Sequence, residues 1–226
     1  MATLSYHEQK DIENIKKLRE LQKELPSFCS DFFRGIETST STRTRIAYAY
    51  DLKIFFQFLK TANPGTFDNP SHTLTPSDLE KLTVTDLEEY IDYLKCHPSD
   101  TNEDVINTER GLMRKVSSLR SFYSYFFRNE RIEKNPAALV RMPKLHEKEI
   151  IRLEIDEVAK LLDEVEEGDK LTEKQKLYHE RTKVRDLAMM SLLLGTGIRV
   201  SECVGLNIND IDLDTCGARV YRKGGK

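Results

Sequence analysis

The chain has 226 residues, of which 38% are hydrophobic and 32% charged, so we predict one or two folded domains and no extensive disorder. The formal net charge is -3, so bulk charge gives no support to nucleic-acid binding, which would have to rest on local basic clusters. No apolar run approaches the roughly 18 residues of a membrane span, and the first residues do not follow the pattern of a secretory signal. The four scattered cysteines favour a cytoplasmic location over a disulfide framework.

Helical spacing of apolar residues predicts helices over residues 7–24, 27–36 and 43–61, followed by a loop over residues 63–75. Pro26 separates the first two helices, and the polar β-branched residues 38–42 supply N-caps for the third. The side chains that we expect in the core are Phe28, Phe32, Phe33, Ala49, Leu52, Phe56 and Leu59.

A further helix opens at Thr83, with Leu87, Tyr90, Ile91 and Leu94 facing inward. Residues 99–104 read as a polar loop, and residues 105–130 form the longest helical pattern. One face of that pattern carries Leu112, Val116, Leu119, Tyr123 and Phe126, and another carries Arg110, Arg114, Ser117, Ser121 and Arg128. Asn135-Pro136 ends it, and a short helix is predicted over residues 137–140.

Residues 142–149 have few large apolar residues and many charges, which indicates an interdomain linker. Beyond it we predict an amphipathic helix over residues 154–166, with Ile155, Val158, Leu161, Leu162 and Val165 inward. A polar stretch over residues 168–180 comes next, then a buried apolar helix over residues 187–194. A turn at residues 209–212 and a strand over residues 218–221 complete the pattern.

The stretch GTGIRVSE, residues 195–202, is the most specific signal. Glycines favour the end of a helix, and a second helix then restarts at Arg199 with Glu202 placed to hold it. A rigidly mounted arginine suits phosphate binding. The alternative is an ordinary turn with a surface arginine, which leaves unexplained the basic glycine turn YRKGGK at residues 221–226.

Basic residues are in local excess between residues 110 and 144, and a second cluster opens the helix at residue 43, where helix amides also suit phosphate. A solvated helix face would look the same. The DNA-binding candidates are Arg43, Arg45, Arg110, Arg114, Lys115, Arg120 and Lys144. The histidines and carboxylates form no metal-ligand pattern, so we expect no metal and no cofactor.

Residues 196–206, TGIRVSECVGL, resemble the first arginine box of the tyrosine recombinase (phage integrase) family, in particular its Xer-like members. Residues 221–226 resemble the hairpin that carries the family's catalytic lysine. Residues 44–59 and 119–136 resemble the opening and closing helices of its core-binding domain. The resemblance implies a mainly α fold: an N-terminal helix (1–24), a SAM-like helical core-binding domain (25–145), and the N-terminal part of an α+β catalytic domain with a small sheet (146–226).

By this resemblance, a tyrosine attacks a DNA phosphodiester and forms a 3′-phosphotyrosyl link. Arg199 would stabilise the charge of the transition state, Glu202 would orient Arg199, and Lys223 would be the general acid for the leaving oxygen. The implied partner is double-stranded DNA, on which the full-length protein would assemble as a tetramer at paired sites, with no membrane involved.

The family's second arginine motif, its later His or Trp and its nucleophilic tyrosine lie beyond the lysine hairpin, whereas this sequence ends at Lys226. We therefore expect a C-terminally truncated polypeptide that binds DNA without cleaving it, with a less stable second unit. A non-catalytic DNA-binding regulator built on the same core-binding domain is the alternative. An all-helical protein-interaction module with a merely solvated basic face is a third.

Overall fold

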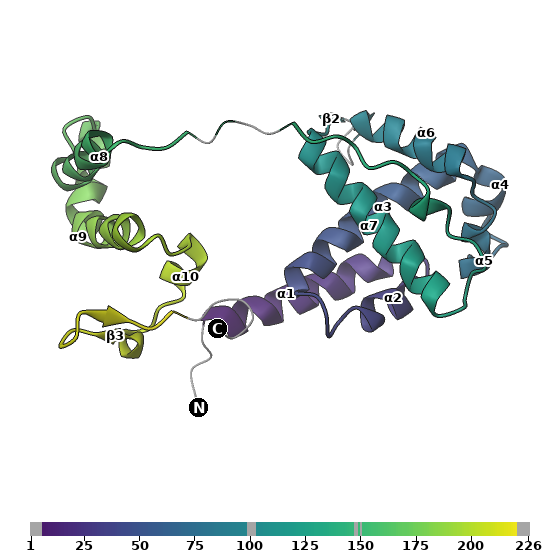
Figure 1. Cartoon of the computed structure of the whole chain (residues 1–226), viewed down its shortest axis with the longest axis horizontal. Helices are drawn as coiled ribbons and strands as arrows, with labels where there is room; N and C mark the ends of the chain where they lie inside the picture. The colour runs from purple at the N-terminus through teal and green to yellow at the C-terminus, as the bar shows by residue number, and fades with distance from the viewer. Residues whose placement is uncertain (1–5, 99–102, 147–148, 150, 221–226) are drawn as a thin grey trace. The chain divides into compact units, whose positions relative to one another are not determined.

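The structure is a computed structural model that describes residues 6–98, 103–146, 149 and 151–220 (Figure 1). The chain divides into two compact units, Met1–Glu147 and Lys148–Lys226. Helices dominate both units, and each unit has one two-stranded antiparallel sheet among its described residues. The predicted mainly α fold is confirmed. In the part of the chain that the structure describes, no helix has the length and apolar character needed to cross a membrane.

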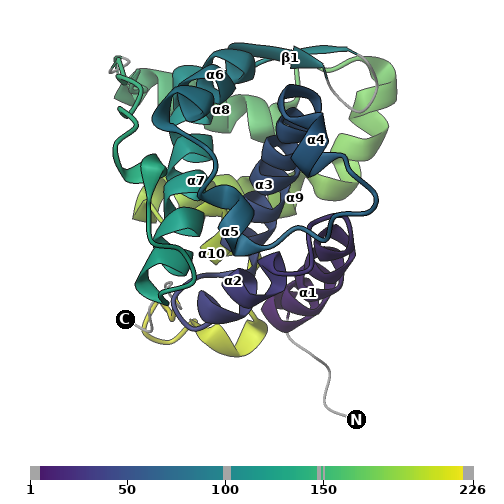
Figure 2. The same ribbon diagram turned by 90° about the vertical axis from the view of Figure 1, so that its right-hand side faces the viewer.

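The first unit is a helical bundle in which α3 contacts both α1 and α7 (Figure 2). Its helices are α1 (Tyr6–Lys23), α2 (Cys29–Gly35), α3 (Thr42–Ala62), α4 (Pro64–Phe67), α5 (Pro76–Leu79), α6 (Val84–Lys95), α7 (Glu109–Arg128) and the 3₁₀ helix η1 (Pro136–Ala138). The single turn α4 lies in the stretch predicted as a loop, where Pro64 occupies the first helical position that proline favours.

Hydroxyl caps set the starts of α3 and α7. Ser41 Oγ accepts the N–H of Thr44 at 3.2 Å at the start of α3, and Thr108 Oγ1 accepts the N–H of Gly111 at 3.2 Å at the start of α7. The predicted start of the longest helix at residue 105 was therefore too early.

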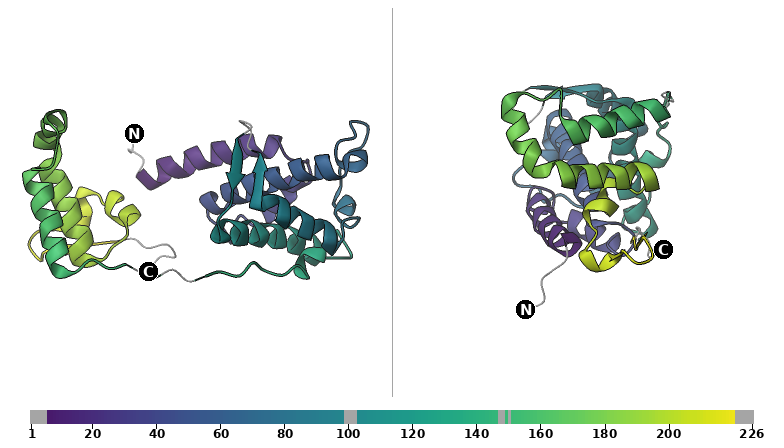
Figure 3. Two further views of the ribbon diagram at one scale, coloured as in Figure 1. Left: turned by 90° about the horizontal axis from the view of Figure 1, so that it is seen from above. Right: turned by 90° about the vertical axis from the view of Figure 1, so that its left-hand side faces the viewer.

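The predicted loop over residues 99–104 was also wrong at its end, because a short hairpin precedes α7 (Figure 3). Strands β1 (Cys96–Pro98) and β2 (Asp104–Ile106) pair antiparallel, with Cys96 opposite Ile106 and Pro98 opposite Asp104. Val105 and Ile106 are β-branched, which favours an extended backbone over helix.

An aromatic cluster joins α2, α3 and α7 in the core of the first unit. The ring centroids of Phe32 and Phe122 lie 5.2 Å apart, those of Phe122 and Phe126 5.1 Å, and those of Phe28 and Phe56 6.1 Å. All five rings are buried, and the predicted inward faces of these three helices are confirmed except for the half-buried Leu112. Each such ring contributes about 2–3 kcal/mol by burial alone, so the core is built where the periodicity placed it.

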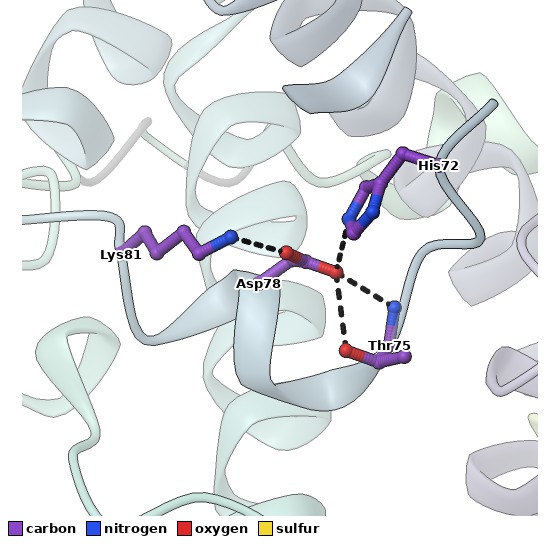
Figure 4. Close-up of polar contacts among 4 residues, drawn as sticks. All are labelled: His72, Thr75, Asp78 and Lys81. Carbon is purple, nitrogen blue, oxygen red and sulfur yellow. Dashed lines mark hydrogen bonds and ion pairs between the residues drawn. The ribbon is translucent and has the colours of Figure 1, made fainter. Parts of the chain in front are cut away.

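Asp78 ties the loop before α6 together (Figure 4). Its carboxylate accepts hydrogen bonds from the Thr75 N–H at 2.9 Å and from Lys81 Nζ at 2.7 Å, and it lies 3.0 Å from His72 Nε2. Burial would raise the pKa of this carboxyl, but the bonds from Lys81, Thr75 and His72 outweigh burial and lower its pKa to about 2. The charged carboxylate therefore fixes the loop between α4 and α6.

The second unit contains α8 (Ile155–Glu167), α9 (Glu173–Thr196), α10 (Val200–Val204), the 3₁₀ helix η2 (Ile208–Asp210), and strands β3 (Ile211–Asp212) and β4 (Gly217–Ala218). The predicted polar stretch over residues 168–180 is largely helical, because α9 begins at Glu173 after Thr172, whose N–H donates to Gln175 Oε1 at 2.9 Å. Of the strand predicted at residues 218–221, only Ala218 lies in a strand, because β4 covers Gly217–Ala218 and Arg219 and Val220 follow it outside the sheet, whereas Tyr221 lies outside the described residues.

The second unit has little core of its own. Among its described residues only Gly168, Glu202 and Cys203 are buried. Leu194 is 38% exposed and Ile155 is 90% exposed, so the predictions of a buried helix over residues 187–194 and of an inward Ile155 were wrong. Among the described elements of the second unit, α8 and α10 pack against α9 (Figure 3), and apolar side chains of α9 such as Leu177 and Val184 remain exposed.

Candidate DNA-binding and catalytic residues

A single left-handed glycine makes the turn before Arg199. Helix α9 continues through Gly195 to Thr196, and Gly197 then adopts φ 67° and ψ 17° while its N–H donates to the Leu193 carbonyl at 2.9 Å. A residue with a Cβ rarely adopts this conformation, which explains the glycine. Of the two glycines that the sequence offered, only Gly197 reverses the chain.

Arg199 is the N-cap of α10 and is held by Glu202. The Arg199 backbone N–H donates to Glu202 Oε2 at 2.9 Å, and its Nη1 donates to Glu202 Oε1 at 2.9 Å. The Glu202 side chain is 8% exposed and the Arg199 side chain is 73% exposed. One buried carboxylate thus starts the helix and anchors the arginine, while most of the guanidinium stays open to an incoming phosphate.

The third catalytic candidate, Lys223, lies outside the described residues, as does the rest of the basic turn 221–226. The described chain leads toward it through β3 and β4, where Ile211 pairs with Ala218. The Arg219 N–H donates to the Asp210 carbonyl at 2.7 Å and closes this hairpin. The roles of Arg199, Glu202 and Lys223 stay predictions.

Four of the seven DNA-binding candidates make hydrogen bonds or ion pairs within the first unit, namely Arg45, Lys115, Arg120 and Arg114. The Arg45 side chain is 9% exposed and donates from Nη1 to Glu37 Oε1 at 2.8 Å. Lys115 is buried, with Nζ 2.6 Å from Asn107 Oδ1, and burial lowers its pKa although Asp51 opposes the shift. Their part in DNA binding stays a prediction, with less support than the sequence suggested.

Arg120 is the third candidate whose side chain is bonded within the first unit. Its Nε donates to the Ala137 carbonyl at 3.1 Å, and its Nη2 donates to the carbonyls of Ala138 and Val140. The guanidinium therefore fastens the chain after η1 to α7. The sequence grouped Lys115 and Arg120 with Arg114 by proximity, but the 3.6-residue turn of α7 directs them to other sides of the helix.

The remaining candidates reach solvent. Arg43, Arg110 and Lys144 are exposed. The Arg114 side chain is 46% exposed, and its Nη1 lies 2.5 Å from Oδ2 of the buried Asp51. Burial raises the Asp51 pKa to about 6, against the opposing effects of Arg114 and Lys115. Arg114 is thus both a surface charge and the partner of a buried carboxylate.

The segment after η1 returns along α7 toward the N-terminal end of that helix (Figure 1). Arg120 holds its beginning, and at its end the His146 N–H donates to Glu109 Oε2 at 2.9 Å. The exposed Arg141 and Lys144 lie on this returning segment, between the end that Arg120 holds and the end that Glu109 holds. We call Arg110, Arg114, Arg141 and Lys144 the α7 basic strip. Arg141 was not among the candidates, since its contribution depends on this return of the chain.

Comparison with known proteins gives a consistent result. Residues 151–226 match the phage integrase family. The chain is 35% identical to tyrosine recombinase XerC of Caldanaerobacter subterraneus subsp. tengcongensis, over 89% of this chain and 53% of that protein. It is 32% identical to tyrosine recombinase XerS of Streptococcus uberis, over 94% of this chain and 65% of that protein. The chain therefore spans between about half and two thirds of the length of these relatives, and the predicted resemblance is confirmed.

Proposed function

We propose that this chain, which belongs to the phage integrase family of tyrosine recombinases, supplies the DNA-binding unit and part of the catalytic site of a Xer-like site-specific recombinase. The observation that carries the proposal is the Arg199–Glu202 pair, which lies within the region that matches the family. An arginine fixed by a buried carboxylate and open to solvent is suited to a phosphate that gains negative charge during reaction.

In this proposal Arg199 contacts the scissile phosphate of DNA and stabilises the pentacoordinate transition state. A preorganised donor of this kind typically contributes about 3 kcal/mol. Glu202 restricts the arginine to one geometry, so little ordering is needed during the reaction. Lys223 delivers a proton to the leaving 5′-oxygen, the role that the resemblance gives it.

The first unit binds duplex DNA through phosphate contacts made by Arg43 and the α7 basic strip. These side chains are exposed or half-exposed in an acidic protein, so the attraction is local. The family's nucleophilic tyrosine follows the lysine hairpin, and no tyrosine follows Tyr221 in these 226 residues. A polypeptide of these residues alone therefore binds DNA without forming a covalent link to it.

Two measurements test the proposal. Fluorescence anisotropy with a labelled duplex should give an affinity that falls steeply as salt rises from 50 to 200 mM. A nicked suicide substrate should give no adduct that survives denaturing electrophoresis. Binding that is insensitive to salt, or no binding at low salt, contradicts the DNA-binding proposal, and a trapped adduct contradicts the absence of cleavage.

A further inference from the structure

A polar pocket opens between α1, α2 and the start of α3 in the first unit. Its volume is about 240 Å³, and its polar lining includes Arg19 and Gln22 from α1, Arg34 from α2, and Glu37 and Arg45. Pockets for drug-sized molecules usually begin at about 300 Å³, so this one suits a small ligand. None of the catalytic candidates lies in it, and neither does any residue of the α7 basic strip.

Arg45 lines this pocket and has hydrogen-bond donors that are not used by the described residues. Its side chain is 9% exposed, and Nη1 donates to Glu37 Oε1 at 2.8 Å. Its Nε is buried and has no hydrogen-bond partner among the described residues, and no bond of Nη2 is found there either. An unpaired buried N–H typically costs about 1–3 kcal/mol. The Nε–Nη2 edge is one of the faces with which arginine binds an oxyanion through two parallel bonds.

The charge around the pocket favours an anion. Three arginines line it against a single carboxylate, that of Glu37, whose side chain is 59% exposed. Arg34 is only loosely paired, with Nη1 3.8 Å from Asp31 Oδ1 and a side chain 76% exposed. Arg19 is exposed. Both surface arginines can therefore turn toward a ligand that rests on Arg45.

We infer that this pocket binds a phosphate-class oxyanion on the Nε–Nη2 edge of Arg45, with Arg19 and Arg34 closing over it. The inference goes beyond the proposed function, because the pocket lining includes neither Arg199 nor any residue of the α7 basic strip. The phosphate comes either from a free phosphate or from the backbone of bound DNA, and the two sources share this chemistry. Bound phosphate satisfies the buried N–H and adds a tie between α1 and α3.

Isothermal titration of the whole chain with inorganic phosphate, against sodium chloride of equal ionic strength, tests the site. We expect saturable binding and a raised Tm with phosphate only. Arg45→Gln should abolish binding. Because Arg45 is buried, the exposed Arg19→Gln and Arg34→Gln variants provide a second test, each weakening binding at least threefold. Lys16→Gln is the matched control, since Lys16 is exposed, lies on α1 three residues from Arg19 and does not line the pocket.

Duplex DNA distinguishes the two sources. In one outcome, saturating duplex prevents phosphate binding to the parent chain, but does not prevent it in Arg43→Gln at duplex concentrations where that variant releases DNA. The DNA backbone then supplies the phosphate. If phosphate binds equally with and without duplex, the ligand is a free phosphate. No saturable binding above the chloride control, or unchanged affinity in Arg19→Gln and Arg34→Gln, overturns the site. The phosphate titration contains no DNA, so its failure is separate from any failure to bind DNA.

Discussion

Arg114 Nη1 lies 2.5 Å from Asp51 Oδ2 and joins α7 to α3 through an ion pair of unequal exposure. The Asp51 side chain is 2% exposed and the Arg114 side chain is 46% exposed. Asp51 Oδ1 is buried and has no partner among the described residues. The carboxylate therefore depends on one arginine, which also forms part of the proposed DNA-binding surface.

Arg114→Met should lower the free energy of unfolding of the first unit by about 2 kcal/mol, because it leaves a buried carboxylate unpaired. This loss of stability is smaller than is usual when a buried ion pair is broken, because water already reaches Arg114. The double variant Asp51→Leu with Arg114→Met should recover part of the loss, as measured by urea denaturation. A double variant whose loss equals the sum of the two single losses would show that the pair is not coupled.

The Asp51 carboxyl should make the first unit less stable as pH rises. Its folded pKa of about 6 lies above the ordinary aspartate value of 3.8, so between these pH values the folded state binds more protons than the unfolded state. The free energy of unfolding should fall from pH 4 to pH 7, by at most about 3 kcal/mol from this group. Asp51→Asn should remove this part of the slope in urea denaturation. An unchanged slope would show that Asp51 titrates normally.

Variants of Arg120 and Arg110 should separate effects on stability from effects on DNA affinity. Arg120→Gln breaks the bonds to the carbonyls of the returning segment and should cost about 2 kcal/mol of stability. Arg120→Lys keeps the charge but lacks the forked geometry, so it should lose most of this stability as well. Arg110→Gln, at an exposed position, should leave the Tm unchanged and weaken DNA binding. Equal destabilisation by Arg110→Gln and Arg120→Gln would contradict the distinction.

Glu202→Gln should loosen the start of α10. The amide can still accept the Arg199 N–H but no longer forms an ion pair with the guanidinium, a loss of about 1 kcal/mol. Hydrogen exchange of the Cys203 N–H, which donates to the Arg199 carbonyl at 3.0 Å, should become about fivefold faster. Glu166→Gln, an exposed change on α8, is the control. No difference between the two variants would show that Glu202 does not hold the turn.

The helical spacing of apolar residues predicted the buried faces well where a helix packs against a single core. The inward faces of α2, α3 and α6 are buried as predicted, with Phe32, Leu59 and Leu87 as examples, except for the half-buried Ile91 of α6, because the first unit supplies partners for each apolar stripe. Periodicity could not reveal that Leu194 and Ile155 stay exposed, since that depends on what packs against α8 and α9. Periodicity also fails to reveal short strands such as β1, because three residues are too few to show an alternating pattern.

Charge was a poorer guide to the candidate interface. In sequence nothing separates Arg45, Lys115 and Arg120 from the exposed Arg110. Only the structure shows their partners, which are Glu37, Asn107 and the carbonyls in and after η1. Arg141 belongs to the α7 basic strip because the chain returns along α7, and the sequence does not show this return. The Arg199 turn could be predicted, because a left-handed glycine and a capping glutamate are local features.

The salt dependence of duplex binding, measured for the parent chain and for Arg43→Gln with Arg110→Gln and Lys144→Gln, tests the central claim most directly. These three side chains are exposed, so the triple variant should keep the Tm of the parent. Each lost phosphate contact should reduce the slope of log affinity against log salt by about 0.9, so the triple variant should lose up to about 2.7. A slope and affinity equal to those of the parent chain would contradict DNA binding through this surface.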